Sequence, residues 1–484
     1  MRLRRNTRYM ADTSTPDNTV QFQDFQGVER TCPVRDFSRT GLSFLLEDGS
    51  LMFRIGDVIS EFRFFSFDKE VHSSAATIIH IIDEFLDNRV ISRIGCRFDN
   101  PLDVSTIIKG DKIARLKNDY IDFIQSLAVE DNLDQEFVYL TSHLHYLLSN
   151  FRAKLKEEEK KISEEEGPTR DLLLNTLREL SLDAINEVAL KYFDHFTKIT
   201  GRFVDSKQHF IHREYFQKML NEFLTASALF KRAYTKPLGY AGDYEMMNII
   251  YRNSFEGEDL FSQVMNKIDC EGSAAKAVRN RREYLSRKIA SVYRSIPEDG
   301  SCKIVSIACG PCVEMADFLG GIREAKRSAK LDFIAMDQDE HALDNASQRL
   351  FPLIEGIEGF RIRITRDNIK DLILGRNKKG NDHYSDADLI YTAGLCDYLS
   401  NNAINRLIRE LYRFLKPGGV LIIGNFGTHN PQRFKMEYGS EWFLIHRSEE
   451  EIRSFIKGLP EDIIYSIEKE PEGINMFLNI TKPA

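Results

Sequence analysis

The sequence predicts a multidomain protein with a small β-barrel, a helical cap and an α/β domain of the Rossmann-like type. Short strand-like runs separated by turn residues fill residues 20–100. Between 105 and 290 glycine and proline become rare, and apolar residues recur at helical spacing. From about 295 onward strand-like and helix-like segments alternate, which is typical of a doubly wound parallel sheet. These changes place the domains at 1–110, 111–292 and 293–484.

The first region is expected to close into a small barrel. Its strand-like runs VQFQDF, CPVRDF, GLSFLLEDG and ATIIHII follow one another at short intervals, with Gly41 and Gly49 where tight turns are needed. The second region is expected to be a helical connector or cap. Its charged run KLKEEEKKISEEEGP is a solvated helix end closed by Gly167-Pro168.

Near the end of the helical region the stretch YTKPLGYAGDYEMMNIIY, residues 234–251, breaks the helical pattern. Pro237, Gly239 and Gly242 predict an ordered loop that presents Tyr240. Such a loop could cover a bound ligand and exclude water. A structural turn that docks a helix is an equally good interpretation.

The third region begins with strands predicted at 303–308 and 331–336 and continues with FRIRIT, DLIYTA and VLIIGNF. Helical segments separate these strands. The chain closes with DIIYSIEKEPEGINMFLNITK, two strands joined by a turn at 471–473. We therefore expect the parallel sheet to end in an antiparallel hairpin.

Composition narrows the class of protein. The 484 residues carry a net charge of −8, so the chain as a whole has no electrostatic attraction to nucleic acid or anionic membranes. Seven scattered cysteines fit a reducing compartment, and no apolar run has the length of a membrane span. His209 and His212 have H-x-x-H spacing without a second ligand cluster, so no metal site is expected. The expectation is a cytoplasmic protein.

The loop SIACGPCVE, residues 306–314, directly follows a predicted strand. Its CGPC matches the redox loop of thioredoxin-like enzymes, but a glycine loop for a nucleotide-like cofactor occupies the same place in other folds. Downstream residues favour the second interpretation. Asp337 follows the second strand, where dinucleotide-type folds bind ribose hydroxyls, and Asp367-Asn368 ends the third, where it could read an adenine amino group.

This order of features resembles the class I S-adenosylmethionine (SAM) methyltransferases over residues 295–484. The family's loop reads Asp/Glu-x-Gly-x-Gly-x-Gly, and the matching positions are Ser306, Ala308, Gly310 and Cys312. Small residues still let the backbone approach a ligand, but the usual acid is missing at Ser306. The resemblance implies SAM as cofactor.

Glu314 could replace the missing acid, although an acid in the first turn of a helix also suits the helix dipole alone. The residues that the resemblance implies for the cofactor are Ala308, Gly310, Glu314, Asp337, Gln338, Asp367, Asn368, Gly394 and Leu395.

A second resemblance rests on several uncommon sequence motifs that occur in a fixed order along the chain: KPLGYAGDYEMMN, RNRREYL (279–285), ACGPC, TAGLCDYLS and NFGTHNPQRFKMEYGSEWFLIHRS (425–448). They resemble bacterial methyltransferases related to enzymes that make the methyl ester of 3-hydroxypalmitic acid, over residues 205–484. The resemblance implies a small or lipid carboxylic acid as acceptor, which needs no general base because it is already ionised. The residues expected to shape its pocket are Tyr240, His429, Tyr438 and Trp442.

His429 could act as a base if the acceptor is a hydroxyl or an amine. A protein carboxylate or a small amine therefore remains an alternative acceptor. The protein could also belong to another functional class, as a second-messenger adaptor whose methyltransferase fold is degenerate and serves only for binding. A homodimer is left open.

The N-terminus carries a signature of its own. Its RRNTR fits R-x-x-x-R, and DFSRTG, residues 36–41, fits [D/N]-x-S-x-x-G. Together they resemble the PilZ domain, a receptor for cyclic di-GMP; a disordered basic tail is the alternative for the first of them. Arginine forks suit phosphate and guanine edges, and a carboxylate accepts from guanine N–H groups. The implied ligand residues are Arg4, Arg5, Arg8, Asp36, Ser38 and Gly41.

Overall fold

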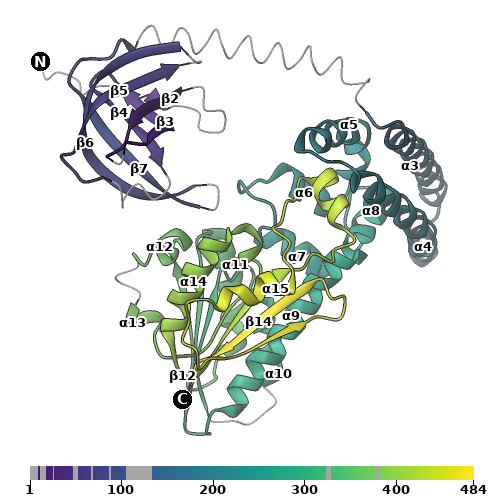
Figure 1. Ribbon diagram of the computed structural model, residues 1–484. Helices are drawn as coiled ribbons and strands as arrows, with labels where there is room; N and C mark the ends of the chain where they lie inside the picture. Colours follow the sequence, from purple (N-terminus) through teal and green to yellow (C-terminus); the bar gives the residue numbers. More distant parts are fainter. Residues whose placement is uncertain are drawn as a thin grey trace, which may run out of the picture. The chain divides into compact units, whose positions relative to one another are not determined.

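The computed structural model describes residues 9–10, 18–25, 27–46, 53–66, 69–86, 89–104, 133–322, 329–376 and 381–483. The chain divides into two compact units, residues 1–131 and 132–484, so the helical and α/β regions belong to one unit (Figure 1). Within the described ranges, each helix is either too short or too polar to cross a membrane.

The first unit is a closed antiparallel barrel, as the sequence predicts. Six strands form its ring in the order β3-β2-β5-β6-β7-β4, and β4 closes it by pairing with β3. A short β1 (Tyr9–Met10) pairs with Asp36 and Phe37 near the end of β3. The strands are β2 (Asn18–Gln23), β3 (Glu29–Ser38), β4 (Gly41–Leu46), β5 (Val58–Ser66), β6 (Lys69–Leu86) and β7 (Arg89–Phe98).

Alternating aromatic residues fill the barrel, because successive side chains of a strand point to opposite faces. Phe22, Phe44 and Phe62 are fully buried, and the rings of Phe22 and Phe62 stack with centroids 5.3 to 5.7 Å from Phe44 and 5.6 Å from each other. Gly41 lies where β4 meets β7. A Cβ added there would lie 2.1 Å from the carbonyl oxygen of Cys96, so this crossing requires glycine.

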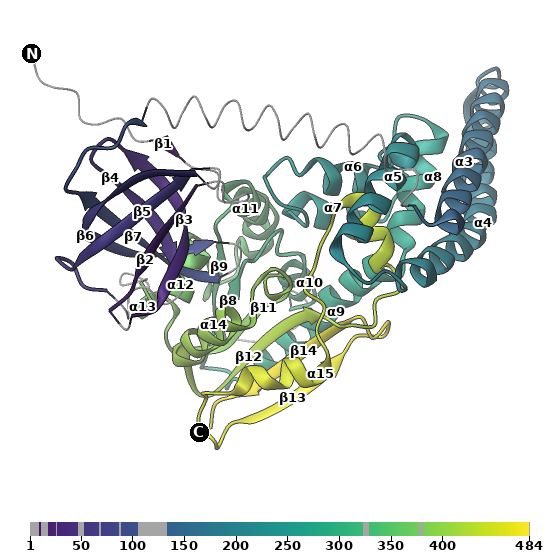
Figure 2. The same ribbon diagram turned by 45° about the horizontal axis from the view of Figure 1, so that its top comes forward.

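Helices fill the first part of the second unit. Two long ones, α3 (Gln135–Ile162) and α4 (Gly167–Thr200), lie side by side (Figures 1 and 2). Five more follow: α5 (Ser206–Leu224), α6 (Ala228–Thr235), α7 (Tyr244–Arg252), α8 (Leu260–Glu271) and α9 (Ser273–Ser295). Side-chain caps start most of them; Asp243, for example, accepts from the backbone N–H of Met246 at 2.9 Å.

The α/β part is a seven-stranded sheet in the order β10-β9-β8-β11-β12-β14-β13. Its first five strands are parallel, and β14 runs antiparallel to both neighbours, which confirms the terminal hairpin. The strands are β8 (Ser301–Ile307), β9 (Lys330–Asp337), β10 (Phe360–Arg366), β11 (Ala387–Thr392), β12 (Leu415–Phe426), β13 (Ile464–Lys469) and β14 (Asn475–Thr481). The strand order reverses between β8 and β11, and ligands of such sheets bind at that switch point, beyond the carboxyl ends of the strands.

Helices cover both faces of this sheet (Figures 1 and 2). On one face α9, α10 (Val313–Ile322) and α11 (Glu340–Ile354) pack in a row over a core that includes the fully buried Ile304, Phe333 and Leu389. The helices α12 (Ile369–Ile373), α13 (Asn381–Tyr384), α14 (Asn401–Phe414) and α15 (Glu449–Arg453) complete the unit. The predicted boundary at residue 292 falls inside α9, whose Tyr284 ring stacks on Phe477 of β14 at 4.0 Å.

Candidate functional site

The loop that joins β8 to α10 has an unusual backbone. Ala308, Gly310 and Cys312 have φ values of 52°, 53° and 51°, so every second residue is left-handed. These are the three positions at which the resembling loop carries glycine, and a left-handed non-glycine residue costs roughly 1 kcal/mol. A Cβ added at Gly310 would meet no atom within 4 Å, so the space above the loop is open.

Asp337, at the end of β9, holds this loop in place. Its Oδ2 accepts from the backbone N–H of Gly310 at 2.9 Å, and its Oδ1 accepts from the N–H of Asp339 at 3.0 Å. The N–H of Cys309 also donates to the carbonyl of Met336 at 3.0 Å. Burial raises the pKa of Asp337, against the opposing effect of the N–H groups. The loop and the carboxylate therefore form one hydrogen-bonded unit at adjacent strand ends.

Glu314 lies beside the loop in the first turn of α10 and is buried. Its Oε1 accepts from the hydroxyl of Tyr391 on β11 at 2.8 Å, and burial raises its pKa. The hydroxyl of Ser306 also interacts with Tyr391. A buried carboxyl group is thus present eight positions after Ser306, in the first turn of α10, and it makes a hydrogen bond that a helix-dipole role alone would not need.

The two loop cysteines do not form a reactive pair. Cys309 and Cys312 are buried as thiols rather than joined in a disulfide. Interaction with Cys312 and burial raise the pKa of Cys309, and the pKa of Cys312 is raised too, since burial and nearby carboxylates outweigh the lowering effect of Cys309. Catalytic redox thiols have lowered pKa values and partial exposure. The geometry favours the glycine-loop interpretation of CGPC.

The predicted lid reaches the same strand ends. Tyr240 donates its hydroxyl to Oδ2 of Asp339 at 3.4 Å. Burial, followed by the charges of Asp337 and Asp339, raises the pKa of Tyr240. Asp243 fixes the far end of the lid, since it caps α7 and accepts from Nε of Arg232 at 2.7 and 2.9 Å. The lid is therefore tied to both flanking helices and to the residues after β9.

Trp442 is held against the lid. Its indole N–H donates to the hydroxyl of Tyr398 at 2.7 Å, and that hydroxyl donates to the carbonyl of Ala241 at 3.0 Å. A Cβ on Gly242 would lie 2.4 Å from the same hydroxyl. Trp442 thus joins the lid to the segment after β11, which carries Tyr398.

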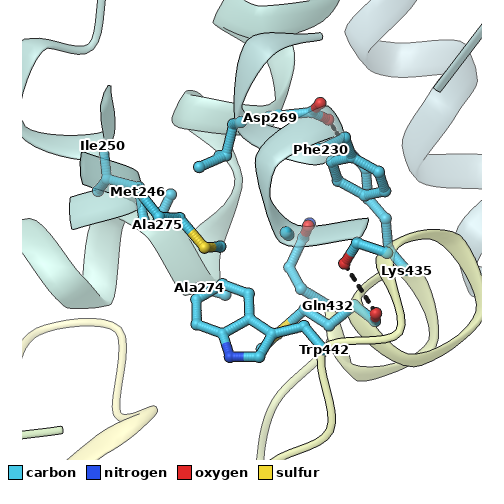
Figure 3. A pocket seen from close by; sticks show the side chains of 13 residues that line it. Phe230, Met246, Ile250, Asp269, Ala274, Ala275, Gln432, Lys435 and Trp442 are labelled. Atoms are coloured by element: carbon cyan, nitrogen blue, oxygen red, sulfur yellow. Dashed lines mark hydrogen bonds and ion pairs between the residues drawn. The ribbon is translucent and has the colours of Figure 1, made fainter. Parts of the chain in front are cut away.

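Behind Trp442 lies a narrow, mostly apolar cavity (Figure 3). It has a volume of about 400 Å³, part of which is open to solvent. Lys435 and Asp269, both buried, form an ion pair of 2.5 Å in its wall. The other lining residues are Leu229, Phe230, Ala233, Met246, Ile250, Ala274, Ala275, Gln432, Met436, Ser440 and Trp442.

The segment after β11 brings charge into the site. Gly394 and Leu395 are half-buried there, and Asp397 is only 2% exposed. Oδ1 of Asp397 accepts from the N–H of Phe426 at 2.6 Å, while burial raises the pKa of this carboxyl to about 7. Arg281 of α9 donates to the carbonyl of Ala393 at 2.9 Å. Asp397 belongs to the motif TAGLCDYLS and Arg281 to RNRREYL, but the sequence alone predicted no role for either residue.

The other residues predicted to bind the cofactor lie further from the loop after β8. Asp367 accepts from the hydroxyl of Tyr384 at 2.5 Å, and its own N–H donates to the carbonyl of Asp337 at 3.2 Å. Asn368 is an exposed cap of α12, where its side chain accepts from the N–H of Lys370 at 2.9 Å, and Gln338 is exposed as well. These residues surround the end of β10, next to Asp337.

Two predicted pocket residues are not brought to the loop. Tyr438 is buried in the helical core, where its hydroxyl bonds Nδ1 of His209 at 2.8 Å and its ring stacks on Phe434. His429 is exposed. His212 accepts from the N–H of Asp134 at 2.8 Å, so both histidines of the H-x-x-H spacing have structural partners. Across the described ranges, no group of His, Cys, Asp and Glu is arranged to hold a metal ion.

In the barrel, Asp36 and Ser38 are buried near the end of β3. Asp36 lies 3.7 Å from Nη1 of Arg93, and the hydroxyl of Ser38 donates to the carbonyl of Gly41 at 3.2 Å. Asp36 and Ser38 thus lie at the end of β3 and Gly41 at the start of β4, so the predicted D-x-S-x-x-G motif spans the turn between these strands. The predicted ligand residues Arg4, Arg5 and Arg8 lie outside the described residues.

Comparison with known proteins gave structural likenesses only. No protein-family model and no curated protein matches the chain. A possible exported protein from Bordetella parapertussis is 17% identical and aligns over 50% of this chain and 80% of its own, with a TM-score of 0.37. Magnesium protoporphyrin IX methyltransferase from Synechocystis PCC 6803, solved with bound SAH, is 11% identical over 52% and 97%, with a TM-score of 0.34.

The complex of MrkH with c-di-GMP from K. pneumonia is 15% identical, and it aligns over 27% of this chain and 55% of its own with a TM-score of 0.19. At these identities and scores, the assignment of the fold rests on the strand order and the loop geometry of the chain itself: a closed barrel, a helical region and a Rossmann-like sheet with a terminal antiparallel hairpin.

Proposed function

We propose that this protein is a cytoplasmic SAM-dependent methyltransferase controlled by cyclic di-GMP. In this proposal residues 1–110 are the receptor domain, 111–292 the connector and cap, and 293–484 the methyltransferase domain. One observation carries the proposal: a loop with three left-handed positions is hydrogen-bonded to the Asp337 carboxylate at the switch point of the sheet.

The residues at this place fit the cofactor. Besides the N–H groups of Gly310, Gln338 and Asp339, the Asp337 carboxylate can accept a further hydrogen bond, as a ribose hydroxyl requires. The open space above Gly310 leaves room for a ligand against the backbone. Asp367 and Asn368 are assigned to the adenine, Glu314 to the amino group, and the remaining contacts fall to Ala308, Gln338, Gly394 and Leu395.

SAM supplies an electrophilic methyl group. The protein's own part is to align the acceptor and exclude water, to which Tyr240, Tyr398 and Trp442 contribute by fixing the lid. We assign a small or lipid carboxylic acid, such as a 3-hydroxy fatty acid, as acceptor; its ionised carboxylate needs no general base.

At the barrel, we assign cyclic di-GMP to Asp36, Ser38 and Gly41 together with the arginines of RRNTR. The carboxylate accepts from guanine N–H groups, and the arginines bind phosphate. Cyclic di-GMP then alters methyl transfer through the helical region. A coupling of this kind requires that the two ligands change each other's affinity.

The test uses purified full-length protein, methyl-labelled SAM and a cell lysate, with and without cyclic di-GMP. Label in the organic-extractable fraction supports a lipid acid, whereas label in protein or polar compounds retains the enzyme and removes the lipid acceptor. A rate that cyclic di-GMP leaves unchanged argues against control by the barrel. Binding of SAM without transfer to any fraction favours the adaptor alternative.

A further inference from the structure

Arg281 of α9 is a buried cation that differs from its arginine neighbours. It is 7% exposed, and no carboxylate of the described residues lies within ion-pair distance of it. By contrast, Arg282 forms a two-bonded ion pair with Asp317 at 2.5 and 2.6 Å. Arg279 donates to the carbonyl of Cys270 at 2.5 Å and lies 3.7 Å from Glu271. Of the three arginines in RNRREYL, the middle one is buried without an ion pair, although the carboxyls of Glu314 and Asp397 are near enough to feel its charge.

The hydrogen bonds of Arg281 leave donor capacity unused. Nη1 donates to the carbonyl of Ala393 at 2.9 Å, Nη2 lies 3.5 Å from the sulfur of Met247, which is a weak acceptor, and the hydroxyl of Tyr251 also interacts with the guanidinium. A guanidinium has five N–H donors, and it is costly to bury without a counter-charge. Two of its N–H groups on one side match the two oxygens of a carboxylate. The site is therefore built for an anion.

The guanidinium lies at the crevice between β8 and β11. Ala393 and Gly394 directly follow β11, and a Cβ on Gly394 would lie 3.3 Å from Nη1 of Arg281. Glu314, beside the loop after β8, is near enough for Arg281 to lower its pKa, yet the two side chains form no ion pair. Two buried, opposite charges thus face the same crevice without neutralising each other. A zwitterion placed between them would satisfy both.

We propose that Arg281 binds the α-carboxylate of the amino-acid part of SAM. This inference rests on the proposed function. Asp337 takes the ribose at the end of β9, so the amino-acid part extends toward the loop and β11, where Arg281 and Glu314 lie. The carboxylate is the only anionic group of SAM. Because Met247 belongs to the helix that follows the lid, α7 and α9 become part of the cofactor site rather than a passive cap.

The test compares two ligands on the full-length protein by isothermal titration calorimetry. One is S-adenosylhomocysteine (SAH), and the other is its decarboxylated analogue, which differs only in the missing carboxylate. Loss of one partner of a buried charge pair predicts that the wild type binds SAH at least about 30-fold more tightly. Arg281→Met should bind both ligands about equally, and Arg281→Lys should retain part of the ratio.

Arg282→Met is the matched control, because Arg282 is the next residue of the same helix and is already paired with Asp317. It should keep the wild-type ratio. If Arg281→Met does not fold, the ratio of the two affinities in the wild type and in Arg281→Lys still tests the proposal. Equal binding of both ligands by the wild type overturns this inference and leaves the proposed function intact. Binding of neither ligand overturns the proposed function, and the inference with it.

Discussion

Replacing Asp397 by asparagine should change how the stability of the second unit depends on pH. Asp397 is buried, and its Oδ1 accepts from the N–H of Phe426. Burial raises the pKa of its carboxyl from 3.8 to about 7, against the lowering effects of that hydrogen bond and of Arg281 and Arg447. Asparagine has the same shape and keeps an acceptor for Phe426, but it has no charge to bury.

The magnitude follows from the two pKa values. Because folding raises the pKa, the folded protein holds a proton that the unfolded chain releases. The stabilisation is complete below pH 3.8 and is lost as the pH rises through about 7. The whole loss corresponds to roughly 4 kcal/mol, of which somewhat more than half falls between about pH 5 and pH 8. The wild type should therefore lose this amount relative to Asp397→Asn over that interval.

Trp442 makes the measurement direct, since it is the one tryptophan of the chain and lies in the second unit. Urea unfolding followed by its fluorescence gives the free energy of unfolding of both proteins at the two pH values. Other groups titrate in both proteins and cancel in the difference. Ser400→Ala is the control, because it removes a nearby helix cap without a titrating group. A difference between wild type and Asp397→Asn that is equal at both pH values would refute the reasoning.

Three further predictions concern the loop, the cavity and the barrel. Ala308→Gly relieves a left-handed alanine, so urea unfolding should show a loss below about 1 kcal/mol, whereas Ala346→Gly in α11 should cost at least about 1 kcal/mol. Lys435→Met leaves Asp269 buried without its partner and should cost about 3–5 kcal/mol by the same assay, most of which the added Asp269→Leu should restore. Gly41→Val places a side chain against the backbone of β7, so limited proteolysis should cleave residues 1–131 of this variant before the rest of the chain. Cleavage of the variant and the wild type at the same rate would contradict the close contact of β4 and β7 at Gly41.

Local patterns were sufficient for the architecture. Short strand-like runs separated by turn residues predicted the barrel, and the alternation of strands and helices predicted the parallel sheet with its closing hairpin. The position of the loop after a strand also followed from local signals, whereas its left-handed backbone at Ala308 and Cys312 did not, because these residue types do not favour that conformation. These features depend on residues that are close together in the sequence, so a single sequence is enough to recognise them.

The rest of the site depends on packing between distant segments. Arg281 and Asp397 are separated by more than a hundred positions, and only the fold shows that both charges are buried at one crevice. Tyr438 was expected at the acceptor pocket, but a π-helical turn, η3 (Lys435–Gly439), carries it into the helical core beside His209. No periodicity in the sequence marks such a turn.

The central claim, that the loop and Asp337 form a SAM site, is tested most directly by calorimetric titration of SAH into the full-length protein and into Asp337→Ala. Asp344→Ala, which removes an exposed acid of α11, is the matched control. We expect one molecule of SAH to bind per chain of the wild type and of the control, and Asp337→Ala to weaken binding at least about 30-fold. Wild-type affinity in Asp337→Ala, or absence of binding by the wild type, would contradict the account.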